Sequence, residues 1–256
     1  IDVKVPGMVY ASIERCPVLH GKVVSVDDSA AKRVNGFIKT VVLEGTQQPM
    51  HVHAGVAVIA TNIWSAMKAR KLLTIVWDEG KKNRESTDEL FKKFEVYSKK
   101  GPVVESYKKG NVHSVKADAA TSLESAFTHP FLAHGTMEPM NFIAQVKDGS
   151  CEVWGGLQLP DWAAGEMAKE LGLKKKNIKI NLALIGGGFG RRLHFDYALE
   201  AVKIARQIDK PVHLIWDRTD DIRNDVFRPA SYHKMKASWS AEGKLLSWQH
   251  HHIAPA

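Results

Sequence analysis

The sequence predicts an α+β protein. Short apolar runs rich in β-branched residues, such as residues 56–60, alternate with stretches in which apolar residues recur at helical spacing. Further along, an apolar run at 178–185 leads into three consecutive glycines and then into another helical pattern. Between these two parts, residues 81–111 are rich in charge and are interrupted by glycine and proline, which indicates a boundary between domains.

The first 77 residues predict a compact α/β module of short strands, a short helix that follows Asp28-Ser29 and ends at Val34, and one longer helix. Its strands are expected at 8–13, 22–26, 37–43, 56–60 and 73–77. Asn62 stands just before the helical pattern, where its side-chain oxygen can accept from the first unpaired backbone N–H groups. Within the charged segment that follows, we expect one amphipathic helix over 87–96.

The residues after 111 predict a second module, which contains the three glycines. Its strands are expected at 142–146, 151–154, 178–185 and 212–216, and its helices at 163–171 and 193–208. Gly172 can end the first of these helices because glycine adopts the left-handed backbone conformation without strain. Around 186–190, the order strand, loop, helix and strand is typical of a βαβ unit.

The bulk composition excludes several classes of protein. The chain has 256 residues, of which 44% are hydrophobic and 25% charged, as in ordinary globular proteins. No apolar run approaches the roughly 20 residues that a membrane-spanning helix needs. Cys16 and Cys151 are too few for an iron–sulfur cluster, which takes about four cysteines. The net charge of +8 comes from short lysine clusters without interleaved aromatic residues, so we expect no nucleic-acid binding.

The strongest functional signal is the segment 186–190, with the sequence Gly-Gly-Gly-Phe-Gly, which we call the glycine loop. Glycines let a backbone approach a ligand closely, and N–H groups ahead of a helix attract anions. A Rossmann fingerprint counted from Gly186 would need a small residue at Arg191, and the lysine of a P-loop is absent. Arg191 and Arg192 stand at a helix start, which is unfavourable for cations unless an anion lies nearby. The simpler alternative is a tight turn that packs a helix on a strand.

This loop and its neighbours resemble the large subunit of the molybdenum hydroxylases, the family of xanthine dehydrogenase and aldehyde oxidase. The version with two arginines is similar to the isoquinoline 1-oxidoreductase beta-subunit branch. Further matches follow in the same order as in that branch: His134-Gly135-Thr136-Met137-Glu138-Pro139-Met140-Asn141, Trp154 with Gln158, Asp196-Tyr197, Trp216 with Arg218, and Arg228-Pro229. Upstream, residues 6–8, 21–27 and 56–78 are similar to an α/β hammerhead domain.

The resemblance implies two family domains and a connection between them. Residues 1–80 would form the α/β hammerhead domain, residues 81–111 the connecting segment, and residues 112–256 the N-terminal part of the molybdopterin-binding domain. Large subunits of this family are longer chains, and their catalytic glutamate lies beyond the part that this sequence resembles. We therefore expect no catalytic residue and no metal ligand within these 256 residues.

The family's site residues transfer to the matching positions of this sequence. Gln158 would hydrogen-bond a ligand of molybdenum, and Phe189 would exclude water beside the metal. The resemblance assigns cofactor binding to Gln158, Gly187, Gly188, Phe189, Gly190 and Arg191. Glu138 would support these residues from behind. For Gln158 the alternative is a surface amide, and for Glu138 it is an ordinary turn carboxylate.

The implied function is that of an oxidoreductase that hydroxylates N-heterocycles or aldehydes with water. Its cofactor would be molybdopterin with molybdenum, in the cytosine dinucleotide form, and its electrons would pass to a small iron–sulfur subunit. The branch favours the periplasm over the cytoplasm, although no export signal is visible in the sequence. The alternative is a stand-alone anion- or nucleotide-binding module, or a scaffold, without catalysis. A thermal shift caused by common nucleotides would favour that alternative.

We expect the isolated 256-residue chain to be inactive and free of cofactor, because the resemblance assigns other walls of the site, and its base, to residues outside this sequence. Metal analysis of the purified chain checks this expectation. Stoichiometric molybdenum in that preparation would contradict it.

Overall fold

The computed structural model describes residues 1–46, 52–80, 86–100, 104–115 and 118–255. Its contacts divide the chain into two compact units, Ile1–Asn83 with Ala133–Val226, and Arg84–Leu132 with Phe227–Ala256. Each unit therefore combines two stretches that are distant in sequence. The domain division at residues 80 and 111 follows the family resemblance and stays a prediction, because compactness alone does not assign a stretch to a family domain.

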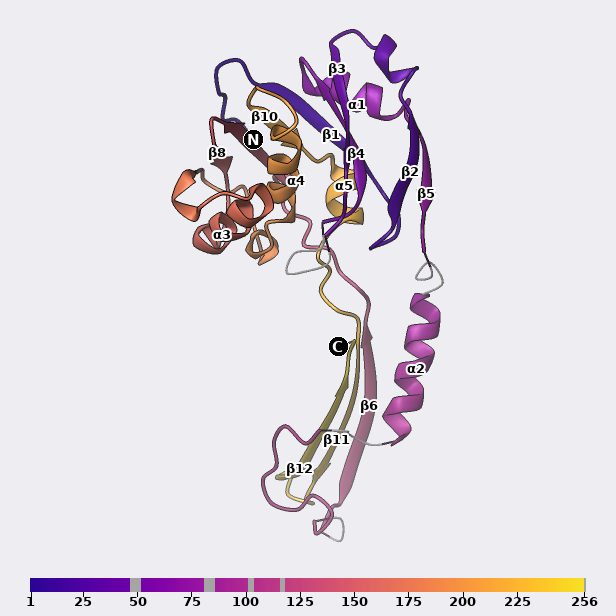
Figure 1. Cartoon of the computed structure of the whole chain (residues 1–256). Coiled ribbons are helices and arrows are strands. Elements are labelled where there is room, and N and C mark those ends of the chain that lie inside the picture. Colours follow the sequence, from indigo (N-terminus) through magenta and orange to yellow (C-terminus); the bar gives the residue numbers. More distant parts are fainter. Residues whose placement is uncertain (47–51, 81–85, 101–103, 116–117, 256) are drawn as a thin grey trace. The chain divides into compact units, whose positions relative to one another are not determined.

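A seven-stranded mixed sheet forms the body of the first unit (Figure 1). Its strands are, in spatial order, β3 (Phe37–Leu43), β4 (Gly55–Ala60), β1 (Val9–Arg15), β10 (Val212–Ile215), β7 (Asn141–Lys147), β8 (Ser150–Gly155) and β9 (Ile178–Leu182). The pairs β1–β10 and β8–β9 are parallel, and the other neighbouring strands are antiparallel. The parallel pairing of β1 with β10 thus joins the beginning of the chain to a strand about two hundred residues later.

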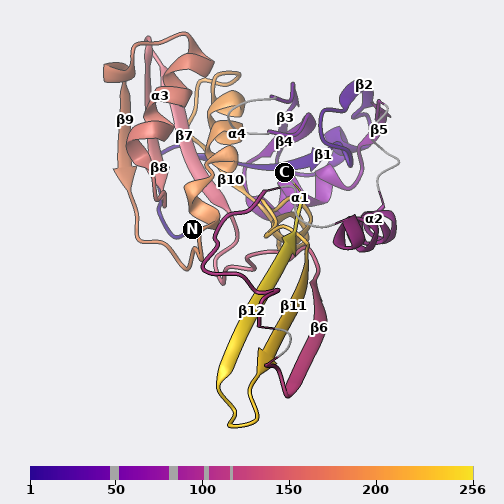
Figure 2. The same ribbon diagram turned by 90° about the horizontal axis from the view of Figure 1, so that it is seen from below.

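The described part of the first unit has four helices, of which the first three pack against strands of this sheet (Figure 2). They are α1 (Ile63–Arg70), α3 (Pro160–Leu171), α4 (Asp196–Ala205) and α5 (Arg218–Arg223), with short 3-10 turns η1 (Ala31–Arg33), η2 (Lys175–Asn177) and η3 (Arg191–Leu193). A separate antiparallel pair is formed by β2 (Lys22–Asp27) and β5 (Thr74–Asp78). No helix among the described residues has the length and apolarity that crossing a bilayer requires.

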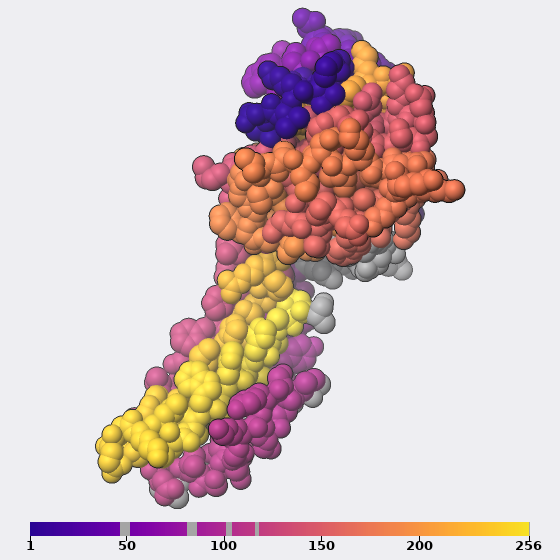
Figure 3. Space-filling model, turned by 90° about the vertical axis from the view of Figure 1, so that its left-hand side faces the viewer, coloured from indigo at the N-terminus to yellow at the C-terminus, as the bar shows by residue number. Residues whose placement is uncertain are grey.

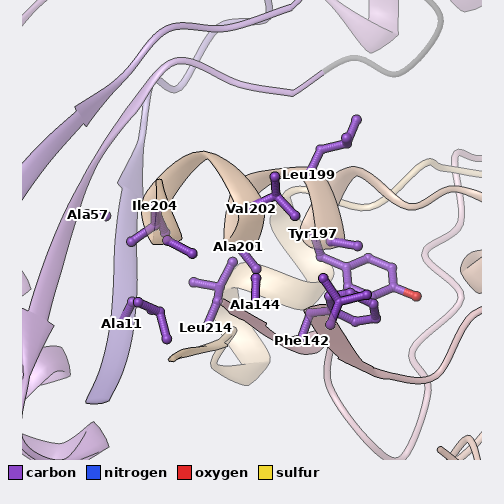
Figure 4. Close-up of a cluster of buried hydrophobic side chains, with 14 of the residues drawn as sticks. Ala11, Ala57, Phe142, Ala144, Tyr197, Leu199, Ala201, Val202, Ile204 and Leu214 are labelled. Carbon is purple, nitrogen blue, oxygen red and sulfur yellow. The ribbon is translucent and has the colours of Figure 1, made fainter. Parts of the chain in front are cut away.

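The main hydrophobic core lies between the sheet and α4 (Figure 4). α4 turns Tyr197, Ala201 and Ile204 toward this core at helical spacing, and all three are fully buried. The ring of Phe142 from β7 meets the Tyr197 ring edge to face, with the two ring centroids 5.9 Å apart. α3 packs against α4 and adds Met167 to the same core. This packing fixes the position of α4, which follows the glycine loop after η3.

Strand β4 is covered on both faces, which explains its unbroken apolar sequence. Ala57 and Ile59 belong to the core beneath α4, whereas Val58 packs with Ala69 of α1 on the opposite face. The start of α1 is as predicted, because the Asn62 side chain accepts from the Ser65 N–H at 2.8 Å. Gly172 also ends α3 as predicted, with a φ of +67°.

The glycine loop connects β9 to α4, and α4 leads to β10, so the predicted order of elements is confirmed. β9 and β10 run in the same direction but are separated by β8 and β7. The predicted strand 178–185 ends early, at Leu182, and the predicted helix 193–208 is shorter, since α4 covers Asp196–Ala205. The glycine loop is therefore preceded by irregular residues 183–185 and followed by the 3-10 turn η3.

The second unit is an antiparallel sheet with one helix. Its strands, in spatial order, are β12 (Leu245–Ile253), β11 (Ser231–Trp239) and β6 (Thr121–His129). The helix α2 (Thr87–Lys100) begins where it is predicted, packs on β11 and β12, and buries Phe94 (Figure 3). The sequence does not predict β6, because its side chains are mostly polar and alternate only weakly.

A buried ion pair joins the sheet of the first unit to α4. The Arg15 guanidinium on β1 donates to both carboxylate oxygens of Glu200 on α4, at 2.7 and 2.6 Å, and both side chains are 3% exposed. The Trp216 indole N–H donates to the same carboxylate at 2.9 Å, and the Arg15 guanidinium stacks on the Trp216 ring. The charges are thus paired and hydrogen-bonded, as buried charges must be.

Replacement Glu200→Ala should lower the free energy of unfolding of the chain by about 3–5 kcal/mol, because it removes both hydrogen bonds to the buried Arg15 guanidinium and leaves it only the Asp220 carboxylate at 3.4 Å. The control is Glu152→Ala, which breaks the exposed pair with Lys179 and should cost under about 1 kcal/mol. Urea unfolding followed by circular dichroism measures both values. Equal losses in the two variants would contradict this account.

Candidate functional site

The glycine loop follows β9 and has an unusual backbone. Three of its residues have a positive φ: Gly187 at +99°, Phe189 at +54° and Gly190 at +101°. Glycine adopts such values freely, whereas for Phe189 they are strained. The Phe189 side chain is also 77% exposed, which is costly for an apolar ring. A strained and exposed aromatic residue indicates a surface that another group covers.

In the glycine loop, most carbonyl groups accept hydrogen bonds from the surrounding protein, whereas most N–H groups do not donate to it. Four carbonyl oxygens accept: Gly186 from the Glu138 N–H at 3.1 Å, Gly187 from Arg192 Nε at 2.9 Å, Gly188 from the Arg191 N–H at 2.8 Å, and Gly190 from the Leu193 N–H at 3.1 Å. By contrast, the N–H groups of residues 187–190 donate to no other group in the described part of the chain. The loop therefore presents donors without acceptors, which suits an anion or another acceptor-rich ligand.

Gln158 lies beside the glycine loop. Its backbone N–H donates to the Arg192 carbonyl at 3.0 Å, and its side chain is exposed. A Cβ added to Gly188 would lie 3.3 Å from Gln158 Oε1, so the side-chain amide stands next to the Gly188 backbone. The amide makes no hydrogen bond with any described residue and is thus free for a ligand.

Glu138 holds the start of the glycine loop through hydrogen bonds. Its carboxylate accepts from the Gly186 N–H at 2.8 Å and from Arg192 Nη2 at 2.8 Å, and its other oxygen accepts from the Asn141 side chain at 3.1 Å. Burial disfavours the charged form, but the hydrogen bonds from the Gly186 N–H and the Asn141 amide and the Arg192 charge lower the pKa of Glu138 below its usual range. Glu138 is therefore ionised at neutral pH and serves as a fixed anion, not as a proton donor.

The structure does not support the expectation that Arg191 binds the cofactor through its side chain. Its side chain is 1% exposed and makes a two-pronged bond to Asp196, with both distances 2.8 Å. Its Nε lies 2.7 Å from a carboxylate oxygen of Asp225, which is also buried. The anion that a helix start requires is thus supplied by the protein itself. Two neighbouring carboxylates neutralise Arg191, and its guanidinium stays in the interior.

Arg192 is equally buried, and its Nε donates to the Gly187 carbonyl of the loop. Sequence analysis finds the pair of arginines but not their partners, because Glu138 and Asp225 are distant in sequence. Asp225 also accepts from the His134 backbone N–H and lies 3.1 Å from His134 Nδ1. Only the unfavourable position of two cations at a helix start could have indicated that buried carboxylates lie nearby.

Two further runs of ionisable residues lie in regular elements, Asp220-Asp221 in α5 and His250-His251-His252 in β12. Asp220 pairs with Arg70 at 2.7 Å, and Asp221 pairs with Arg218 at 2.6 Å, so the acidic pair neutralises arginines. The three histidines at 250–252 form part of strand β12. No group of three or more potential ligands that could hold a metal ion occurs among the described residues.

A comparison with known families matches residues 96–256 to the molybdopterin cofactor-binding domain. The isoquinoline 1-oxidoreductase subunit beta of Brevundimonas diminuta is 32% identical over 261 residues, which cover 98% of this chain and 32% of the relative. A membrane-bound aldehyde dehydrogenase of Gluconacetobacter polyoxogenes, named with pyrroloquinoline quinone, is 30% identical over 250 residues, or 96% of this chain and 32% of the relative. The chain thus spans about a third of the length of these relatives.

Solved structures agree on the fold. The crystal structure of quinoline 2-oxidoreductase from Pseudomonas putida 86 superposes with a TM-score of 0.71 over 98% of this chain and 36% of that chain, at 18% identity. The reconstituted CO dehydrogenase of Oligotropha carboxidovorans gives a TM-score of 0.69 over 99% of this chain and 37% of that chain, also at 18% identity. Such low identity supports similarity of fold alone.

Replacement Gly186→Ala should distort the glycine loop, because the added Cβ would lie 2.5 Å from the Glu138 Cβ. We expect the free energy of unfolding to fall by about 1–3 kcal/mol, the usual cost of overpacking. The control is Gly165→Ala within α3, where an added Cβ meets nothing within 4 Å and should stabilise by about 0.5–1 kcal/mol. Chemical denaturation measures both, and an unchanged Gly186→Ala variant would contradict the close approach.

Proposed function

Because this chain belongs to the molybdopterin cofactor-binding family, we propose that its glycine loop forms one wall of a molybdenum-cofactor site. One observation carries the proposal. The loop uses its carbonyl groups internally and leaves the N–H groups of residues 187–190 free. Such a row of donors matches the phosphate and oxygen acceptors of a molybdopterin cofactor.

The residues present fit this cofactor. Gly187, Gly188 and Gly190 carry no side chain that would keep a ligand from the backbone, and the Gln158 amide adds a polar group beside them. Phe189 supplies an exposed apolar ring that would exclude water once a ligand covers it. Arg191 is not among the contacts in this proposal, because its guanidinium is bound to two buried carboxylates.

The cofactor, when bound, supplies the redox chemistry of hydroxylation by water. This chain's own residues bind and orient it: Gln158 through its side chain, the loop through its backbone, and Glu138 by holding Gly186. None of these groups is poised to move a proton, since Glu138 is fixed as a carboxylate by its neighbours. The catalytic base is therefore assigned to a part of the protein outside these residues.

We further propose the activity that the relatives' names suggest. The protein would hydroxylate N-heterocycles or aldehydes and pass electrons to a separate iron–sulfur subunit. One relative is named a subunit of isoquinoline 1-oxidoreductase, and the other is named for aldehydes, which supports this assignment. The cofactor would be the cytosine dinucleotide form, the site of action would be the periplasm, and residues 1–80 would be the α/β hammerhead domain that precedes the cofactor-binding domain.

Molybdenum content tests the proposed function. The protein in its natural form, purified from its host, should contain stoichiometric molybdenum, which is measured by plasma mass spectrometry. The variant Gln158→Ala should retain about five-fold less molybdenum after dialysis, the factor that corresponds to one lost hydrogen bond. The matched control is Gln249→Ala on β12, an exposed glutamine in the second unit, which should retain the native amount.

Native protein without molybdenum would contradict the proposal. Pyrroloquinoline quinone in its place, which absorption spectroscopy detects, would favour the cofactor named for the Gluconacetobacter relative. Equal losses of molybdenum in the Gln158→Ala and Gln249→Ala variants would remove Gln158 from the site.

A further inference from the structure

The direction of one peptide group in the glycine loop depends on a single side chain. A peptide is planar and trans, so the carbonyl of Gly187 and the N–H of Gly188 point in opposite directions. That carbonyl accepts from Arg192 Nε at 2.9 Å, which turns the Gly188 N–H away from Arg192. The other loop carbonyls that accept hydrogen bonds are held by backbone N–H groups. A peptide between two glycines rotates easily, since neither residue has a Cβ.

Arg192 itself is held firmly in place. Its side chain is 1% exposed, and its Nη2 donates to the Glu138 carboxylate at 2.8 Å and to the Glu138 carbonyl at 3.1 Å. The same carboxylate accepts from the Gly186 N–H. The planar guanidinium thus connects Glu138, which binds the start of the loop, to Gly187 in its middle.

The neighbouring arginine does not share this role. Arg191 and Arg192 are consecutive in the 3-10 turn η3, where successive side chains point about 120° apart. Arg191 therefore reaches Asp196 and Asp225, on the side away from Glu138. The two arginines look equivalent in sequence, but among the described residues only the Arg192 side chain donates to a carbonyl of the glycine loop.

We propose that Arg192, held by Glu138, is a positioning residue that aims the Gly188 N–H at an acceptor atom of the bound cofactor. This inference rests on the proposed function. Gly188 lies next to the Gln158 side chain, since a Cβ added to Gly188 would lie 3.3 Å from Gln158 Oε1, so a cofactor atom that accepts from the Gly188 N–H would also lie near this amide. If the peptide turned over, a carbonyl oxygen would replace the N–H there and would repel an electron-rich ligand.

The chemistry of arginine provides a sharp test. Lysine keeps the positive charge for Glu138 but has a methylene group where arginine has Nε–H, so Arg192→Lys loses the bond to the Gly187 carbonyl. The matched control is Arg15→Lys, which changes an equally buried arginine bound to Glu200 through the same two nitrogens and away from the loop. Both variants are made in the natural form of the protein.

We expect crystal structures of Arg192→Lys to show the Gly187–Gly188 peptide turned over. The variant should lose molybdenum about ten-fold faster on dialysis, the factor for one hydrogen bond to a charged or strongly polar acceptor. Its molybdenum(V) electron paramagnetic resonance signal should also change. Arg15→Lys should keep the native peptide direction, retention and signal even where its melting temperature falls.

Three outcomes would overturn the inference: a native peptide direction in Arg192→Lys, a turned peptide with native retention and signal, or the same changes in Arg15→Lys. If Arg192→Lys does not fold, the double variant Arg192→Gln with Glu138→Gln removes the guanidinium without leaving a buried charge, and the same readouts apply. Absence of molybdenum from the native protein is a separate result, visible before any variant is made, and contradicts the proposed function instead.

Discussion

The structure around the glycine loop depends on the neutralisation of two consecutive buried arginines. Arg191 and Arg192 are both 1% exposed at the side chain, and a buried charge without a partner costs several kcal/mol. Arg191 binds Asp196 and Asp225, and Arg192 binds Glu138. Because these carboxylates belong to different segments, the loop can take its form only when those segments have come together.

This arrangement also explains how a loop rich in glycine is held in one conformation. Glycines give the backbone freedom that would ordinarily make the loop variable. Here the carbonyls of Gly186, Gly187, Gly188 and Gly190 are each hydrogen-bonded, and no side chain of the loop itself takes part. The glycines allow a ligand to approach the backbone closely. The surrounding residues already hold the loop in one conformation, so the entropic cost of ordering it is not added to the cost of binding.

Each of the two compact units is assembled from stretches far apart in sequence. In the first unit, β1 pairs with β10, and the Arg15–Glu200 ion pair connects β1 with α4. In the second, β6 pairs with β11 across about a hundred residues. The glycine loop therefore belongs to a unit whose sheet includes β1. Because the Arg15–Glu200 ion pair links that sheet to α4, the stability of the sheet affects the position of the loop.

The sequence by itself determined the local elements and the family. Hydrophobic periodicity, the Asn62 cap and the Gly172 stop predict α1, α3 and α4 because helix starts and ends depend on neighbouring residues. The order of motifs around the glycine loop is sufficient to identify the molybdopterin cofactor-binding family. Gln158 beside the loop was likewise predictable from that order.

Only the tertiary structure decided what the two arginines do. Their sequence context predicts two similar cations that face solvent or a ligand. The fold instead buries both and pairs each with different carboxylates, Arg191 with Asp225 and Arg192 with Glu138. The polar strand β6 is another such case, since its pairing with β11 and not its own pattern makes it a strand. Ion pairs and sheet pairings join residues at arbitrary separations along the chain, and spacing within a sequence carries no information about them.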